Sequence, residues 1–127
     1  MAGFRLTKDN CDDIGFAKSC LLAGVVTFDE FKQWLFWVIE NESEVPAYFW
    51  DIIDLQESYE FKPLQLMGFN PYWLHKDDEN AALDGIGFKR WSNFASDSRS
   101  RTEALQKLAE NPHVEKRFRA AFPFIEL

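Results

Sequence analysis

Three acidic side chains and a tryptophan occur together between positions 50 and 57, in a segment that we expect to be helical. At 100° per residue, Asp51, Asp54 and Glu57 share one arc of such a helix, and Trp50 lies between Asp54 and Glu57. Carboxylates can pair with lysine or arginine of a partner, and an indole supplies the apolar area typical of an interface hot spot. The segment therefore predicts a surface that binds a basic protein. The predicted partner-binding residues are Glu42, Glu44, Tyr48, Trp50, Asp51, Asp54 and Glu57.

Two other interpretations of this acidic segment remain open. The face is an ordinary solvated surface if residues 59–75 cover Trp50. The carboxylates could instead bind a metal ion or act as paired acids in hydrolysis. Hard cations, however, take roughly six or more oxygen ligands, usually from a turning loop, and the chain has no Asp-x-Asp-x-Asp-Gly loop. We expect no metal ion and no cofactor.

Other residues that commonly carry catalysis do not form a recognisable motif. His75 and His113 each stand without a second histidine or a cysteine at ligand spacing. The chain has no Gly-x-Ser-x-Gly sequence, and Gly85-Ile86-Gly87 lacks the third glycine of a dinucleotide-binding loop. A Cys–His pair assembled from distant positions stays open. We expect a binding protein rather than an enzyme.

The net charge of −7 argues against nucleic acid and anionic membranes as partners, because phosphate groups need a basic surface. The charge is also uneven. Residues 1–84 hold sixteen acidic and six basic side chains, whereas residues 85–127 hold five and eight. We expect the basic residues of the second part to complement a helix dipole or to pair with the acidic first part. These are Arg99, Arg101, Lys116, Arg117 and Arg119.

Length and composition predict one soluble domain. A chain of 127 residues, of which 46% are hydrophobic, can bury a core of its own. Cys11 and Cys20 are separated by about 13 Å along one predicted helix and cannot pair there, which fits a reducing cytoplasm. The longest near-apolar run, Trp34–Ile39, is too short to span a bilayer, and the first ten residues lack an apolar signal core. The oligomeric state is not determined by the sequence.

Residues that typically begin or cap helices predict the helices of the first half. Thr7 is a plausible N-cap for a helix over residues 8–23. Thr27 and Glu30 have the spacing of a capping box, so a central helix should run from residue 28 to about 41. Pro46 is placed to open a third helix that reaches about residue 56. Phe36 falls in the polar stripe of the central helix, which favours packing under another segment over surface exposure.

The second half predicts four more helical segments and leaves one doubt. We expect a short helix at 63–67, a helix from 77 to as far as 94, and helices over 102–110 and 112–122. Gly85 and Gly87 indicate either a break or a close helix crossing. A strand pair within residues 59–94 remains the structural alternative. The predicted fold is mainly all-α, a compact bundle of about five to seven helices.

The chain is small, acidic and aromatic-rich, and its segment from residue 7 to 58 contains the runs Phe28 to Leu35, Val38-Ile39-Glu40 and Val45 to Ile52. In these runs the segment resembles the immunity proteins of bacterial toxin systems, those of contact-dependent inhibition and of colicin-type nucleases. The resemblance implies a protein that neutralises a cognate toxin domain by binding its basic surface. None of the contact residues of the colicin nuclease inhibitors carries over, because their paired-tyrosine motif is absent. A helical adaptor or regulatory subunit is the alternative function.

Overall fold

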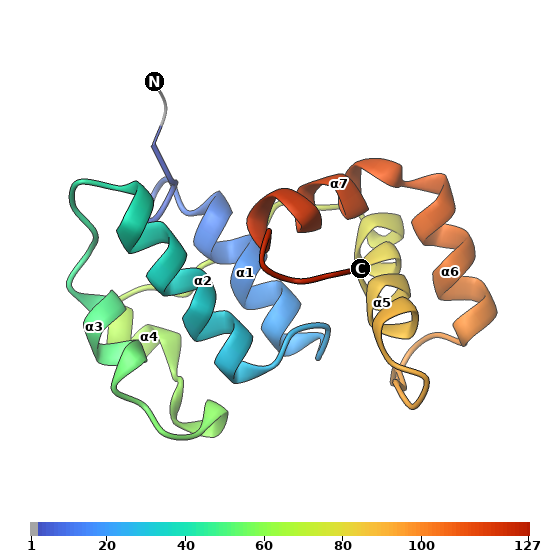
Figure 1. Ribbon diagram of the computed structural model, residues 1–127, viewed down its shortest axis with the longest axis horizontal. Coiled ribbons are helices and arrows are strands. Elements are labelled where there is room, and N and C mark those ends of the chain that lie inside the picture. The colour runs from blue at the N-terminus through green and yellow to red at the C-terminus, as the bar shows by residue number, and fades with distance from the viewer. Residues whose placement is uncertain (1–2) are drawn as a thin grey trace. The chain divides into compact units, whose positions relative to one another are not determined.

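The computed structural model describes residues 3–127, and within that range the chain is helical and forms no strand. The all-α prediction is therefore confirmed, and no strand pair occurs in residues 59–94. The elements in chain order are α1 (Asp12–Leu22), α2 (Phe28–Asn41), α3 (Tyr48–Ile53), the 3-10 helix η1 (Ser58–Glu60), α4 (Pro63–Met67), α5 (Asp77–Arg90), α6 (Arg101–Glu110) and α7 (Pro112–Ala121) (Figure 1).

The chain divides into two compact units. Unit 1 comprises Met1–Ser19 and Thr27–Trp73, and unit 2 comprises Cys20–Val26 and Leu74–Leu127. Unit 1 has twelve acidic and five basic side chains, whereas unit 2 has nine of each. Unit 1 thus carries the whole net charge of −7, and unit 2 is neutral. Whether the two units make up one folding domain stays a prediction.

Helix α2 begins and ends where its sequence predicts. The Thr27 hydroxyl accepts the Glu30 N–H at 3.1 Å, and the Glu30 carboxylate accepts the Thr27 N–H at 2.8 Å. This reciprocal capping box satisfies two N–H groups that the first helical turn leaves without partners. Four apolar side chains of α2 are buried: Phe31, Trp34, Leu35 and Val38. Phe36 is 47% exposed, so the expectation that it packs under another segment is wrong.

The start predicted for the first helix is also wrong. Thr7 does not cap a helix, because its N–H and carbonyl pair with the carbonyl and N–H of Asn10, both at 3.0 Å. This closed turn occupies the groups that a helix starting at residue 8 would need. Helix α1 consequently begins only at Asp12, where the Arg5 side chain bonds the carboxylate of Asp13.

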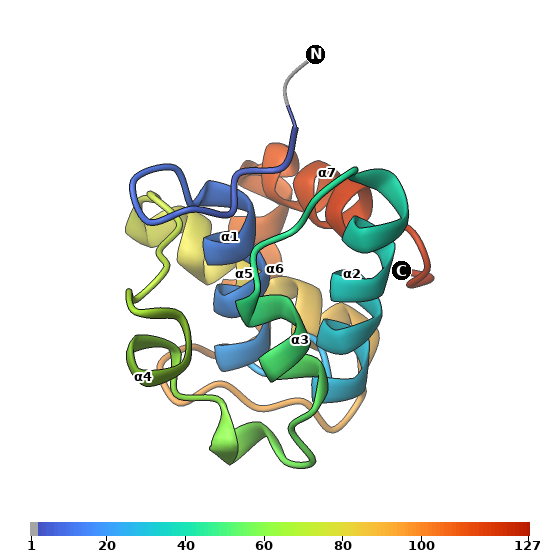
Figure 2. The same ribbon diagram turned by 90° about the vertical axis from the view of Figure 1, so that its left-hand side faces the viewer.

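Helix α3 is shorter than predicted at both ends. Pro46 precedes the helix instead of opening it, and Ala47 is the N-cap. At the other end, the backbone N–H groups of Gln56 and Glu57 donate to the Glu60 carboxylate at 3.0 and 2.8 Å. Because these two N–H groups bond Glu60, they do not continue the hydrogen-bond pattern of α3, which ends at Ile53. Figure 2 shows α3 between α2 and α4, both of which it contacts.

In unit 2, α5 runs without a break through both of its glycines and crosses α6 closely. A Cβ atom on Gly85 would lie 2.5 Å from the Ala104 carbonyl oxygen and 2.8 Å from the Leu108 Cβ. The absence of a side chain at Gly85 therefore sets the approach of the two helices. Of the two expectations for these glycines, the close helix crossing is confirmed. Helix α6 is capped by the Ser100 hydroxyl, and Pro112 opens α7 as predicted.

Candidate partner-binding surface

One side of α3 is buried, so its opposite side faces outward. Phe49 and Ile52 are fully buried, and the Phe49 ring lies 6.2 Å from that of Trp34. The Tyr48 hydroxyl donates to the Leu6 carbonyl at 2.6 Å. With these side chains anchored, Trp50 projects from the opposite side and is 51% exposed. An indole that is half exposed while its neighbours are buried is a candidate contact residue.

Trp50 also lines a hollow together with two acidic residues. The hollow measures about 380 Å³ and combines apolar and acidic lining side chains. Glu42 at its rim accepts the Phe4 N–H at 2.7 Å, which anchors this carboxylate, whereas Glu44 is exposed. We call it the acidic hollow, and its lining residues are Ile39, Glu42, Ser43, Glu44, Val45 and Trp50.

Asp51 and Asp54 are the exposed carboxylates of α3 and its C-cap. Within residues 3–127, neither side chain forms an ion pair or a hydrogen bond, and the same holds for Glu44. Glu57 differs, because its carboxylate accepts the Glu60 N–H in the capping box of η1. Three of the predicted acids are thus fully available to a partner, while Glu57 and Glu42 are already used in part by the fold.

Tyr48 does not belong to this surface. Its side chain is only 7% exposed, and its hydroxyl is satisfied inside unit 1. The prediction that Tyr48 extends the exposed patch is therefore wrong in geometry. The physical reason is that the Leu6 carbonyl offers the phenol an acceptor next to the core, so the ring can be buried without leaving a polar atom unpaired. Burial also raises the pKa of Tyr48 above its ordinary value.

The basic residues of unit 1 leave these acids unneutralised. Arg5 pairs with Asp12 and Asp13 at 3.3 and 2.8 Å. Lys18 donates to Asn70 and to the Pro71 carbonyl. Lys32 donates to the Leu55 carbonyl and lies over the Phe28 ring. The surface formed by Trp50, Glu44, Asp51 and Asp54 therefore keeps its negative charge, which attracts a positive partner over distances of about 10 Å.

Residues that would support metal binding or nucleophilic chemistry are not gathered at this surface. Within residues 3–127, no three His, Cys, Asp or Glu side chains lie close enough together to hold a metal ion. Cys11 and Cys20 are both free and buried. Burial raises the pKa of the Cys20 thiol well above its ordinary value, which disfavours the thiolate needed for nucleophilic chemistry.

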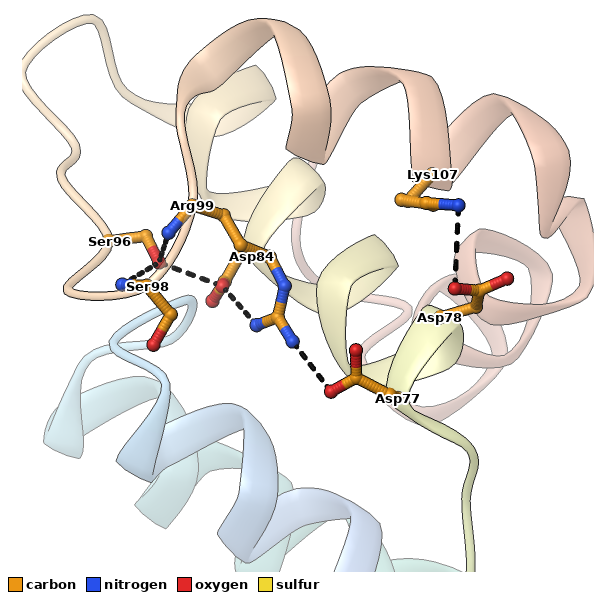
Figure 3. Close-up of polar contacts among 7 residues, drawn as sticks. All are labelled: Asp77, Asp78, Asp84, Ser96, Ser98, Arg99 and Lys107. Carbon is orange, nitrogen blue, oxygen red and sulfur yellow. Dashed lines mark hydrogen bonds and ion pairs between the residues drawn. The ribbon is translucent and has the colours of Figure 1, made fainter.

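Two basic residues of unit 2, Arg99 and Lys107, pair with acidic residues of α5. Sequence reasoning identified this network only in outline. Arg99 donates to Asp84 at 3.1 Å and to Asp77 at 2.9 Å, and Lys107 lies 3.4 Å from Asp78 (Figure 3). The Ser96 hydroxyl also donates to Asp84. Asp84 stands within an apolar run of α5, and that position is the one signal in the sequence for a buried, paired acid.

Comparison with protein-family models, with curated proteins and with solved structures finds no match for this chain. The resemblance to toxin immunity proteins therefore stays an expectation. Among the helices of residues 3–127, none combines the length and the apolar character that crossing a membrane requires.

Proposed function

We propose that this protein binds a basic protein partner through Trp50 and the carboxylates of Glu44, Asp51 and Asp54, with Glu42 at the rim of the acidic hollow. The observation that carries the proposal is the exposed indole of Trp50 next to acids without internal partners. The more specific form of the proposal is an immunity protein that neutralises a cognate bacterial toxin domain in the cytoplasm. That form rests on the resemblance of residues 7–58.

The energetics of such an interface favour Trp50 as its anchor. Exposed ion pairs contribute roughly 0–1 kcal/mol each, whereas truncation of a central tryptophan commonly costs about 2 kcal/mol or more of binding energy. The acids mainly raise the rate of encounter and reject partners of the same charge. A lysine or arginine of the partner fits the acidic hollow, since it can pair with Glu44 and lie against the Trp50 ring.

A pull-down at low salt, with mass spectrometry of the captured proteins, identifies the partner. Charge reversal by Asp51→Lys together with Asp54→Lys should then reduce capture and weaken its salt dependence. Asp97→Lys with Glu126→Lys is the matched control, because it changes the charge equally at two exposed acids of unit 2. If both double variants fold and capture the partner equally, the assigned surface is wrong.

Loss of the partner's activity on binding would distinguish an inhibitor from an adaptor. An immunity protein should abolish the toxicity of its partner when the two are produced together in bacteria, and Trp50→Ala should restore that toxicity. A partner that keeps its activity in the complex supports the adaptor instead. The gene next to this one offers the first partner to test if it encodes a toxin.

A further inference from the structure

A second concave surface lies entirely within unit 2 and differs in charge from the acidic hollow. It is a groove of about 600 Å³ between helices α5, α6 and α7. Its floor is apolar and its rim is mostly basic. We call it the basic groove, and its lining residues are Lys89, Arg101, Leu105, Leu108, Ala109, Pro112, Glu115, Lys116 and Arg119.

Helical spacing explains how these residues meet. In α6, Arg101, Leu105 and Leu108 recur at intervals of four and three positions, so they follow one stripe of the helix. In α7, Pro112, Glu115, Lys116 and Arg119 recur in the same way. Two such stripes from consecutive helices form the walls of the basic groove. The basic groove is therefore lined mainly by two regular helices of unit 2.

The basic groove has more positive charge than its internal pairs neutralise. Lys89 and Arg119 share the single carboxylate of Glu115, at 2.9 and 3.1 Å. Arg101 donates to the Phe88 carbonyl at 3.0 Å, which carries no full charge. Lys116 is exposed and forms no ion pair within residues 3–127. Four cations and one anion give the groove a local charge of +3, in a neutral unit of an acidic protein.

From this combination we infer that the basic groove binds a small amphiphilic anion, a medium-chain fatty acid. Its volume is in the range of small-molecule sites, roughly 300–1,000 Å³. The aliphatic chain would cover Leu105, Leu108 and Ala109, and the carboxylate would pair with the rim cations, foremost Arg101. Charge-assisted hydrogen bonds of this kind are about twice as strong as neutral ones. An aliphatic chain alone would leave the basic rim without a partner, and a carboxylate alone would leave the apolar floor uncovered.

Titration of the whole protein with decanoate below its micelle concentration tests the inference, with binding measured by calorimetry and by amide NMR shifts. Decanoate should bind with shifts concentrated in α6 and α7. Decanol, which keeps the chain, and acetate, which keeps the charge, should each bind at least tenfold more weakly. Decanol binding as tightly as decanoate would overturn the role of the basic rim.

Variants locate the site without disturbing the fold. Arg101→Gln with Lys116→Gln should weaken decanoate binding at least about tenfold. Ala109→Glu should abolish it, because Ala109 is exposed on the groove and the new carboxylate repels the ligand. Lys8→Gln with Lys62→Gln, two exposed cations of unit 1, removes the same charge and should leave binding unchanged.

Three results would overturn the inference: equal binding by the groove variants and the control, NMR shifts confined to other segments, or capture of an acidic helical peptide by a groove that ignores decanoate. Because the basic groove and the acidic hollow lie in different units, failure of one proposal leaves the other intact. Asp51→Lys with Asp54→Lys should not alter decanoate affinity.

Discussion

The Arg99 guanidinium donates to the Asp84 carboxylate at 3.1 Å, and each of the two side chains is only 12% exposed. Asp84 lies on α5, and Arg99 lies in the loop that leads to α6. The same carboxylate accepts the Ser96 hydroxyl, and Arg99 also reaches Asp77. The loop between α5 and α6 is thus tied to α5 by one nearly buried acid.

Removal of this acid should destabilise the protein strongly. Asp84→Ala leaves the Arg99 charge without its buried partner, and breaking such a pair costs about 3–5 kcal/mol of unfolding free energy. Urea denaturation followed by circular dichroism measures the change. Asp97 is an exposed acid of the same loop and forms no ion pair within residues 3–127, so Asp97→Ala should change the unfolding free energy by less than about 0.5 kcal/mol. Equal effects of the two substitutions would contradict the role given to Asp84.

The two glycines of α5 should respond differently to a methyl group. At Gly85 the new Cβ meets a backbone carbonyl at 2.5 Å, so α6 must shift, and overpacking of this kind costs about 1–3 kcal/mol. At Gly87 the nearest atoms belong to the half-buried Phe94 ring, which can rotate away. Both variants gain about 1 kcal/mol of helix propensity. Thermal unfolding should therefore show Gly85→Ala as clearly less stable than Gly87→Ala, and the reverse order would show that the crossing is not tight.

Two tryptophans of unit 1 should separate stability from binding. Trp50→Ala removes an exposed side chain, so the unfolding free energy should change by about 0.5 kcal/mol or less while partner capture is lost. Trp34→Ala opens a cavity in the core and should cost about 3–5 kcal/mol. Denaturation curves of the two variants test this contrast. A large loss of stability in Trp50→Ala would mean that its indole is needed for folding.

Acid should weaken unit 2 through two glutamates. Hydrogen bonds from the Lys76 backbone and from His113 lower the pKa of Glu79, and hydrogen bonds from Lys89 and Arg119 lower the pKa of Glu115. A carboxylate whose pKa is lower in the folded state binds fewer protons there than in the unfolded chain. Its contribution to stability is therefore present above the ordinary pKa of 4.5 and is lost as the pH falls below that value.

Urea denaturation between pH 3 and pH 6 measures this dependence. The unfolding free energy should fall as the pH drops below about 4.5, and less steeply in Glu79→Gln and in Glu115→Gln. Glu126→Gln is the control, because Glu126 is exposed and forms no ion pair in the described part of the chain, and this variant should keep the slope of the natural chain. An unchanged slope in both test variants would show that these two carboxylates do not titrate differently on folding.

Local signals predicted the helices whose ends depend on neighbouring residues. The capping box of Thr27 and Glu30 placed α2, Pro63 and Gly68 bounded α4, and Pro112 opened α7. Each of these signals acts within a few positions, so the sequence alone carries it. The α5–α6 crossing was one of two interpretations of Gly85 and Gly87, and only the position of α6 decided between them.

The errors arose where the residue type alone fits more than one structure. Tyr48 is buried because the Leu6 carbonyl, 42 positions away, accepts a hydrogen bond from its hydroxyl. Thr7 closes a turn with Asn10, although its residue type suits an N-cap equally well. Phe36 stays exposed, since no segment of the described chain covers it fully. The exposure of Trp50 likewise depends on whether another segment covers it. A helical wheel gives the direction of its side chain but not the segments that pack against it.

Within residues 3–127, the side chains of Glu44, Asp51 and Asp54 form no hydrogen bond or ion pair. Because Asp51 and Asp54 stabilise no contact of the fold, their replacement carries little penalty for folding. Asp84, in contrast, stabilises the fold through its hydrogen bonds with Ser96 and Arg99. The recognition proposed for α3 can accordingly change one residue at a time while the architecture of unit 1 is kept.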